Sequence, residues 1–461
     1  MAGDILHHIR KLRSTPFTPF LSVREPSAFS RRISVAWLAA VCYGIVFLGM
    51  RCYIIDSVFR RFILRSSIMA DFHKEYDIVV SGAGIAGVSA ALAAARRGLR
   101  TALIEKQTLI GGLATSGLIY VYLPLCDGNG RQVSFGIAEE FLLAGLKYSP
   151  YDLPPEWGGP AKGFTGMHKL STPFRYKALF SPAGLTLALD ELLKDAGVDL
   201  WLDTMVCAVQ KGGDNNVTAV EVENSSGRGV VSAKRFVDAT GDATVVRRAG
   251  GAFETDINYI TPWVMEADID CAYHPVSPGV HIAVSGAHKP EFPIENAVNS
   301  KVATNFTRTV WQMKRDEYDA AYASGVQSRK TLYPVHLPAM PQFRKIAHIV
   351  GVENIQENDA GKYVESSVGL CADWRKRNSV WEVPYGSLIP ADVQGVLAAG
   401  RCMASCGDSW EVFRVIPAAA VTGEAAGVAS ALSIKENCDA KELDIELLRR
   451  ELSSNGFVFH I

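Results

Sequence analysis

The sequence predicts an α/β fold in which a parallel sheet with an attached β-meander is interrupted by an inserted, mixed α+β region. Three observations support this class. An apolar run at residues 77–80 is typical of a buried parallel strand. A glycine-rich turn and a helix of small residues follow it, and a second apolar run at 101–104 ends at Glu105. Strand, helix and strand in this order form a βαβ unit, which is the building block of a parallel sheet.

The glycine turn has the spacing of a dinucleotide-binding loop. Gly82 permits a tight turn, Gly84 lets the backbone approach a pyrophosphate, and Gly87 allows the helix to pack closely on the sheet. Glu105 follows Gly82 by 23 positions, where a carboxylate can accept hydrogen bonds from ribose hydroxyls. Its charge disfavours a 2′-phosphate at the same place. The alternative is a βαβ unit with an incidental glycine turn.

The rest of the chain divides into segments of different character. A second glycine-rich loop lies at 111–117, and the stretch 118–180, rich in Gly, Pro and aromatic residues, is expected to be irregular. We then expect a helix at 183–196, strands at 198–202 and 205–209, an antiparallel set at 217–222, 229–232 and 235–237, a polar helix around Thr304–Ala323, nucleotide-binding character at 395–400 and a small-residue helix at 418–432.

These segments predict four regions. The regions are a basic leader at 1–68, a discontinuous nucleotide-binding domain at 75–117, 181–250 and 391–435, a substrate or cap region at 118–180 and 251–390, and a helical C-terminal tail at 436–461.

Length and composition indicate a globular protein of two or three domains. The chain has 461 residues, 48% of them hydrophobic, and a formal net charge of −1, so nothing suggests nucleic-acid binding. The nine cysteines are scattered, and the pair Cys402 and Cys406 has no cluster of histidines or cysteines nearby. We therefore expect neither a metal site nor a disulfide framework.

The N-terminal segment carries ten Lys and Arg residues against three acidic ones within 1–68. Residues 34–50 hold no charge, and the apolar run continues past Arg51 to residue 55. This length is near the lower limit for a transmembrane helix, so 34–55 is a candidate single-pass membrane anchor. A cleavable signal fits less well, because the apolar run starts late. The other expectation is a dispensable extension of a cytoplasmic protein, since Met69 would make a natural start.

Six segments, in this order, resemble one family. They are Gly82–Gly87; Glu105 with Gly111–Gly117; Phe180–Ala183 with the helix after it; Asp238–Asp242; Val383–Pro390; and Ala399–Cys402 followed by Arg414–Pro417. Together they resemble the FAD-dependent oxidoreductases with a glutathione-reductase-like fold, in the branch related to fumarate reductase flavoproteins. The resemblance covers roughly residues 75–455.

The resemblance implies a Rossmann-like FAD-binding domain with bound FAD and an inserted substrate domain. The first glycine turn would hold the pyrophosphate at the start of a helix, and the backbone of Val206 would face adenine. Pro417 suits the first turn of the last long helix, whose amides at Ala418 and Ala419 would point at the flavin pyrimidine. Asp242 either bonds the cofactor or caps a helix. The cofactor residues implied are Gly82, Gly84, Ile85, Ala86, Gly87, Glu105, Lys106, Gly111, Gly112, Ala114, Thr115, Val206, Ala239, Thr240, Gly241, Asp242, Gly400, Arg401, Pro417, Ala418 and Ala419.

Missing and altered motifs narrow the chemistry. No second GxGxxG occurs, so a dedicated nicotinamide domain is not expected, and no Cys-x4-Cys follows Gly112, which argues against a disulfide reductase. Gly386 stands where the family commonly has an arginine, and the family's basic stretch at 344–348 is here partly apolar. Both departures concern the substrate rather than FAD.

Arg414 and Tyr385 are the candidate catalytic residues. The resemblance places Arg414 where an arginine holds a substrate carboxylate, and a guanidinium fork suits that role. The alternative for Arg414 is an ion pair with Asp408 or Glu411. Tyr385 either donates a proton or holds substrate near the flavin, or it is a buried structural tyrosine. Three histidines, His281, His336 and His348, lie in the substrate region. Each is either a catalytic residue or an ordinary surface or core histidine.

The leading hypothesis is an FAD-dependent oxidoreductase that transfers a hydride between flavin N5 and a small organic substrate. The reductant or oxidant would come from substrate, oxygen or a partner. One alternative is a flavin-dependent monooxygenase, because residues 241–248 faintly resemble the Asp-Gly loop of aromatic hydroxylases. The other is a non-catalytic, FAD-binding scaffold tethered to a membrane.

Overall fold

The computed structural model describes residues 70–129, 131–153, 178–269, 279–285 and 294–461. The leader and its candidate anchor at 34–55 lie outside these residues. Among the described helices, no single one has the length and apolar character needed to cross a membrane. The bent pair α9 (Gly407–Phe413) and α10 (Ile416–Lys435), with 83° between its halves, meets the test only when the two are taken together. Since α10 is buried along most of its length, it has the character of a core helix.

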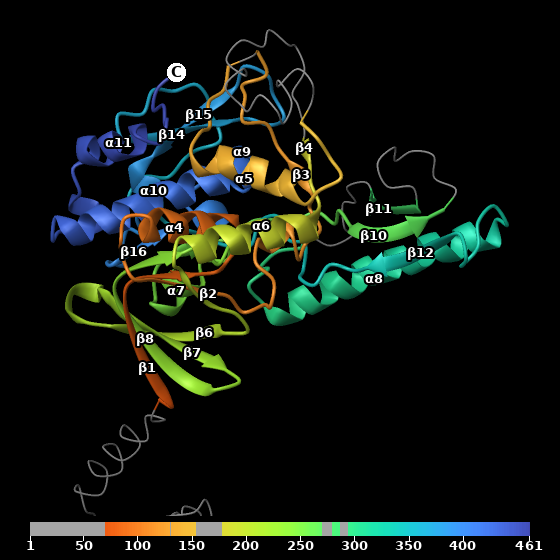
Figure 1. Ribbon diagram of the computed structural model, residues 1–461, viewed down its shortest axis with the longest axis horizontal. Helices are drawn as coiled ribbons and strands as arrows, with labels where there is room; N and C mark the ends of the chain where they lie inside the picture. Colours follow the sequence, from red (N-terminus) through yellow and green to blue (C-terminus); the bar gives the residue numbers. More distant parts are fainter. Residues whose placement is uncertain (1–69, 130, 154–177, 270–278, 286–293) are drawn as a thin grey trace, which may run out of the picture. The chain divides into compact units, whose positions relative to one another are not determined.

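A seven-stranded sheet carries the described α/β core (Figure 1). Its order is β5–β2–β1–β8–β7–β6, and β16 pairs with β8. The pairs among β1, β2, β5, β8 and β16 are parallel, whereas β6, β7 and β8 form an antiparallel meander. This arrangement confirms the predicted Rossmann-like α/β class. The strand bounds are β1 Phe72–Ser81, β2 Thr101–Ile104, β5 Asp199–Trp201, β6 Met205–Lys211, β7 Val217–Asn224, β8 Gly227–Asp238 and β16 Val396–Ala398.

Two details of this sheet can be compared with the sequence predictions. Ile78, Val79 and Val80 of β1 are completely buried, as expected for a strand covered on both faces. The runs predicted separately at 229–232 and 235–237 are parts of one twelve-residue strand, β8. Its first half pairs with β7 and its second half with β16, so one strand joins the meander to the parallel sheet.

The helix of the first βαβ unit, α4 (Ile85–Ala95), packs against α10 through small residues. A Cβ atom added at Gly423 would lie 2.2 Å from the carbonyl oxygen of Ala86, and one at Gly427 would lie 2.3 Å from that of Ala90. The two helix backbones therefore touch, and only glycine fits at these two positions. This contact fixes the start of α10 beside the glycine turn.

The expectation that 118–180 is irregular is wrong for part of that stretch. It contains the helix α5 (Ile137–Lys147), whose buried residues Ile137, Ala138, Phe141, Leu142 and Gly145 recur at helical spacing. Helix α5 packs on α6 (Pro182–Asp195) and α10. The turn-forming composition on either side of α5 concealed this period in the sequence.

A separate three-stranded antiparallel sheet, ordered β11–β10–β12, lies beside the long helix α8 (Ser300–Ala323) (Figure 1). Helix α8 corresponds to the polar helix predicted around Thr304–Ala323. Tyr318 and Lys314 of α8 join it to β10: the Tyr318 hydroxyl donates to Glu266 Oε2 at 2.8 Å, and Lys314 Nζ lies 3.3 Å from the same atom. The remaining bounds are β3 Val121–Tyr122, β4 Ala178–Leu179, α7 Thr244–Arg248, β9 Phe253–Glu254, β10 Trp263–Asp268, β11 Gly279–Val284, β12 Leu332–His336, β13 His348–Ile349, β14 Ser367–Ala372, β15 Val380–Pro384 and α11 Ile445–Ser453.

Candidate functional site

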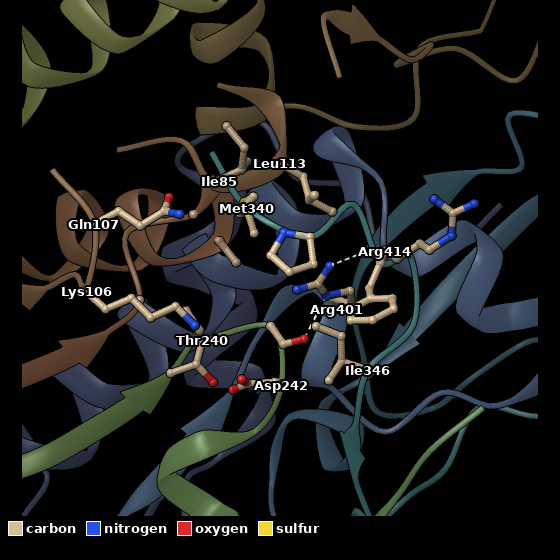
Figure 2. Close-up of a pocket in the computed structure, with 18 of the residues that line it drawn as sticks. Ile85, Lys106, Gln107, Leu113, Thr240, Asp242, Met340, Ile346, Arg401 and Arg414 are labelled. Atoms are coloured by element: carbon tan, nitrogen blue, oxygen red, sulfur yellow. Dashed lines mark hydrogen bonds between the residues drawn. The ribbon is translucent and has the colours of Figure 1, made fainter. Parts of the chain in front are cut away.

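A cavity of about 340 Å³ lies where the glycine turn, the end of β2, the second glycine loop, the loop after β8 and the start of α10 meet (Figure 2). The start of α8 and the segment 339–346 also line it. The predicted site residues that line this cavity are Gly82, Gly84, Ile85, Ala86, Glu105, Lys106, Gly111, Gly112, Ala114, Ala239, Thr240, Gly241, Asp242, Arg401, Arg414 and Ala419. Segments spread over more than 300 positions of the chain are thus brought to one place.

The three glycines of the turn have different surroundings. Gly82 adopts a φ of +92°, and a Cβ there would lie 2.6 Å from the carbonyl oxygen of Ala239. A Cβ at Gly87 would lie 1.7 Å from the carbonyl oxygen of Gly82. A Cβ at Gly84, in contrast, would meet nothing within 4 Å. Gly82 and Gly87 are therefore required by the fold, whereas Gly84 leaves open space in front of its backbone.

That open space lies at the start of α4. Gly84 is the N-cap residue and, as a glycine, provides no side-chain cap for the amides of the first turn. The first amides of a helix lack partners within the helix and carry the positive end of its dipole. An anionic group such as a pyrophosphate fits this position.

Glu105 is buried at the end of β2. Its Oε2 accepts from the amide of Ala83 at 2.7 Å, and its Oε1 accepts from the amide of Gln107 at 3.0 Å. Burial raises the pKa of Glu105, and the two amides partly offset that rise. A carboxylate has about four acceptor positions, so the bonds to Ala83 and Gln107 leave capacity for ribose hydroxyls.

The second glycine loop is held against the first. Gly111 and Gly112 have φ angles of +98° and +59°, and the amide of Gly111 donates to the carbonyl of Ala83 at 2.7 Å. A Cβ at Gly112 would approach the Cα of Gly84 to 3.1 Å. Thr115 does not line the cavity; its hydroxyl donates to the carbonyl of Ile110 at 2.5 Å and so closes the loop.

The loop after β8 is shaped by a buried acid. Asp238 Oδ2 accepts from the amides of Val245 and Val246 at 2.8 and 3.0 Å, which caps the short helix α7. This bonding turns residues 239–242 toward the cavity. Asp242 lines the cavity: burial would raise the pKa of its carboxyl, but Lys106 and the hydroxyl of Thr244 bring the net pKa below its usual value. In Figure 2 the Lys106 side chain extends toward Thr240 and Asp242.

Arg401 occupies the middle of the site in Figure 2. Its Nε donates to the carbonyl of Gly241 at 2.7 Å, and its Nη1 donates to the carbonyl of Phe343 at 2.6 Å. The side chain therefore links the loop after β8 to the segment 339–346. Burial, which disfavours the charged form, lowers the pKa of Arg401 to about 10.

Arg414 lines the cavity, but its guanidinium is engaged elsewhere. Nε donates to Glu411 Oε2 at 2.8 Å, and Nη2 contacts the same oxygen. Figure 2 shows the guanidinium directed away from Arg401. Lys345 Nζ lies 3.3 Å from the other oxygen of Glu411. The ion pair with Glu411, which is one of the two alternatives for Arg414, is the arrangement present here.

Tyr385 lies away from the cavity. Its buried hydroxyl donates to the carbonyl of Ala440 at 2.7 Å, and burial raises its pKa well above the usual value. This contact is the structural alternative, and we do not place Tyr385 in the site. The histidines 281, 336 and 348 are likewise not among the residues that line the cavity.

Six further residues that were predicted to bind the cofactor do not line the cavity. Val206 lies on β6 and belongs to a different core cluster. The amide of Gly400 donates to Thr422 Oγ1 at 3.0 Å. Pro417 lies in the first turn of α10, as predicted, and the amide of Ala419 donates within the helix to the carbonyl of Val415 at 2.8 Å. The six residues are Gly87, Thr115, Val206, Gly400, Pro417 and Ala418.

Sequence reasoning missed one whole side of the cavity. We call it the cap wall, and its residues are Ala297, Val298, Ala303, Met340, Pro341, Phe343 and Ile346. These side chains match no motif, and their shared position depends on how α8 and the segment 339–346 fold back over the glycine loops. No local pattern in the sequence carries that information.

A family model described as "FAD dependent oxidoreductase" matches residues 77–340 and 354–452. No curated protein matches the chain.

Among solved structures, the chain is similar to a geranylgeranyl bacteriochlorophyll reductase-like protein from Thermoplasma acidophilum, with 16% identity, 84% of each chain covered and a TM-score of 0.44. It is also similar to p-nitrophenol 4-monooxygenase PnpA from Pseudomonas putida DLL-E4, with 13% identity, coverage of 83% of this chain and 89% of that one, and a TM-score of 0.47. Likeness at this level does not bear on the reaction.

Proposed function

This chain belongs to the FAD dependent oxidoreductase family and is an enzyme that uses FAD, and from that premise we propose that it transfers a hydride between FAD and a small organic substrate held in the same cavity. The observation that carries the proposal is that the cavity has a polar side, formed by the glycine loops, and an apolar side, formed by the cap wall. The glycine loops offer backbone amides and a ribose acceptor, whereas the cap wall offers only apolar side chains.

The described residues fit FAD on the first of these surfaces. The space in front of Gly84, which a Cβ would fill, lies beside the uncapped first turn of α4 and suits the pyrophosphate. Glu105 keeps acceptor capacity for the adenosine ribose. The second glycine loop and the start of α10 extend the same wall of the cavity toward Arg414 and Ile416.

The residues of the cap wall would position the substrate and exclude water. When bound, FAD supplies a hydride acceptor and donor at N5 of its ring. Arg401 ties the segment 339–346 to the loop after β8, so the cap wall is fixed opposite the cofactor surface. Holding two reactants in a fixed geometry within a dry cavity is a large part of catalysis by such enzymes. Because Nε and Nη2 of Arg414 donate to Glu411, only the remaining donors of its guanidinium are left for a substrate carboxylate.

The test begins with the full-length protein purified without added flavin. We expect a flavin absorption spectrum and about one FAD released per chain on denaturation. Candidate substrates are then added without oxygen, and bleaching of the flavin band marks hydride transfer. A protein that neither contains nor takes up FAD would refute the proposal.

NADH and NADPH separate the proposal from the monooxygenase alternative. The sequence has no second dinucleotide turn, so we expect slow or no bleaching with either nucleotide alone. Rapid bleaching by NADH or NADPH, followed by oxygen-dependent hydroxylation of an aromatic compound, would instead establish a monooxygenase.

A further inference from the structure

We infer that the substrate of this cavity has an extended apolar body, aliphatic or aromatic, which packs on the cap wall, and that small dicarboxylates are excluded. The inference rests on the proposed function, because it names the substrate class of the same site. It departs from what the resemblance to fumarate reductase flavoproteins implies for Arg414.

The first argument is the composition of the cap wall. The two segments that form it contribute eight apolar lining residues, the seven of the cap wall and Ala339, and the polar residues beside them are Asn299 and Ser300. Asn299 is the N-cap of α8, and its side chain accepts from the amide of Lys301 at 2.8 Å. Its carbonyl group is therefore committed to its own helix.

The second argument is that a buried apolar cluster backs part of the cap wall. Phe343 is 1% exposed and packs on Phe306 with 4.4 Å between the ring centroids. Ala297, Phe306, Val310 and Phe343 belong to one buried cluster, and Ala303 and Ile346 pack against it. Because a hydrophobic cluster backs these side chains, the surface that they present to a ligand stays apolar.

The third argument is that the charged groups beside the cavity already have protein partners. Arg401 donates to two carbonyls, and Arg414 donates to Glu411. Lys106 faces Asp242, whose pKa it lowers. A substrate with two carboxylates would direct at least one of them at the cap wall, whose own side chains offer no donor, and the polar lining residues beside it, Asn299 and Ser300, are uncharged. Burial of an unpaired carboxylate is strongly unfavourable.

The experiment uses the FAD-loaded full-length protein and follows the flavin absorption spectrum during titration with unreactive probes. Alcohols from butan-1-ol to octan-1-ol are compared with diols and diacids of equal length, from succinate to suberate. We expect the affinity of the alcohols to rise about three- to fourfold for each methylene added. Diols should show a smaller rise, and diacids should bind at least about tenfold more weakly than the alcohol of equal length.

Variants then locate the apolar contact. Ile346→Asn should reduce the affinity for octan-1-ol at least about fivefold without changing the FAD content. Val298→Ser, at a half-exposed position at the start of α8, tests the same wall if the first variant folds poorly. Val326→Ser is the matched control, because Val326 is 82% exposed and does not line the cavity.

Three outcomes would overturn the inference: an affinity that is independent of chain length, diacids that bind more tightly than alcohols, or loss of FAD rather than of probe binding in both wall variants. The last result would assign the wall to the cofactor. Each of these leaves FAD bound to the wild-type protein and so leaves the proposed function standing, whereas a wild-type protein without flavin would refute that function itself.

Discussion

Glu105 Oε2 accepts a hydrogen bond of 2.7 Å from the amide of Ala83, which ties the end of β2 to the glycine turn after β1. The amide of Gly111 donates to the carbonyl of the same Ala83 at 2.7 Å, so Ala83 joins both glycine loops and the ribose acceptor. Three segments that touch FAD in the proposed site are therefore positioned through one residue. Preorganisation of this kind lets binding energy go into holding the cofactor rather than ordering the loops.

Substitution Glu105→Ala is expected to weaken FAD binding. It removes the proposed ribose acceptor and leaves the amide of Ala83 without its partner, and hydrogen bonds to a charged group contribute about 1.5–3 kcal/mol each. We expect the dissociation constant of FAD, measured by titration of the apoprotein, to rise at least about tenfold. Glu75→Ala, at an exposed position on β1, is the control and should bind FAD as the wild type does. Equal affinities in the two variants would disprove the assignment.

Substitution Tyr385→Phe is expected to affect stability and not chemistry. The hydroxyl of Tyr385 is buried on the carbonyl of Ala440 and does not reach the cavity. Its removal deletes one buried hydrogen bond, which costs about 0.5–1.5 kcal/mol, while the carbonyl of Ala440 still accepts from the amide of Leu443 at 3.3 Å. Urea denaturation should show this loss, while the FAD content and the rate of flavin reduction should stay within about twofold of the wild type. A much slower reduction would restore Tyr385 as a catalytic residue.

Glu424 lies inside the protein on α10 and is 1% exposed. Its Oε2 accepts from the amide of Ile137, at the start of α5, at 2.7 Å, and its Oε1 accepts from Asn455 Nδ2 at 2.6 Å. Burial raises the pKa of Glu424 to about 7, although these two donors and Arg97 oppose the rise and Glu140 adds to it.

The raised pKa of Glu424 predicts a pH dependence of stability. A carboxyl whose folded pKa exceeds its unfolded value binds more protons when folded, so its contribution is complete below about pH 4.5 and is lost as the pH rises through about 7. One pKa unit corresponds to about 1.4 kcal/mol, so the loss is on the order of 3 kcal/mol.

The near-isosteric variant Glu424→Gln cannot ionise and should lack this loss. Its unfolding free energy relative to the wild type should therefore rise by about 2–3 kcal/mol between pH 5 and pH 8, as measured by urea denaturation. Glu451→Gln is the control, because Glu451 lines the same pocket as Glu424 but its side chain is 42% exposed and pairs with Arg97. Parallel pH profiles of Glu424→Gln and the wild type would contradict the prediction.

The sequence was informative where neighbouring positions determine structure. The glycine turn, the small-residue helix and Glu105 were predicted because turn geometry and close helix packing depend on residue types at fixed spacing. Helix α5 was missed, because it is short and lies between stretches rich in Gly, Pro and aromatic residues. Its five buried positions show the helical period only once its bounds are known.

The substrate side of the cavity was not predictable in the same way. Phe343 and Ile346 reach the cavity because Arg401, nearly 60 positions further along the chain, holds the segment 339–346 against the loop after β8. That contact depends on tertiary structure alone. The converse holds for Val206, whose role was carried over from the resemblance. Its side chain packs in a core cluster and does not line the cavity, so its contact with adenine stays a prediction.

Substitutions of Gly84 and Gly87 in the first turn distinguish a role in FAD binding from a role in folding. Gly87→Ala should destabilise the protein by about 3 kcal/mol or more, because its Cβ would lie 1.7 Å from the carbonyl oxygen of Gly82. Gly84→Val should leave stability within about 1 kcal/mol of the wild type, since Gly84 has ordinary extended dihedral angles and its Cβ meets nothing within 4 Å. Thermal unfolding of the two apoproteins checks this contrast, and equal losses of stability would contradict it.

The FAD content of folded Gly84→Val is the measurement that tests the account most directly. The purified variant is denatured, and the released flavin is counted per chain beside the wild type. The account predicts about one FAD per wild-type chain and less than about one tenth of that in the variant, with unchanged stability of the apoprotein, because the valine side chain fills the space assigned to the pyrophosphate. A folded variant that retains a full complement of FAD would show that the cofactor does not lie at this turn.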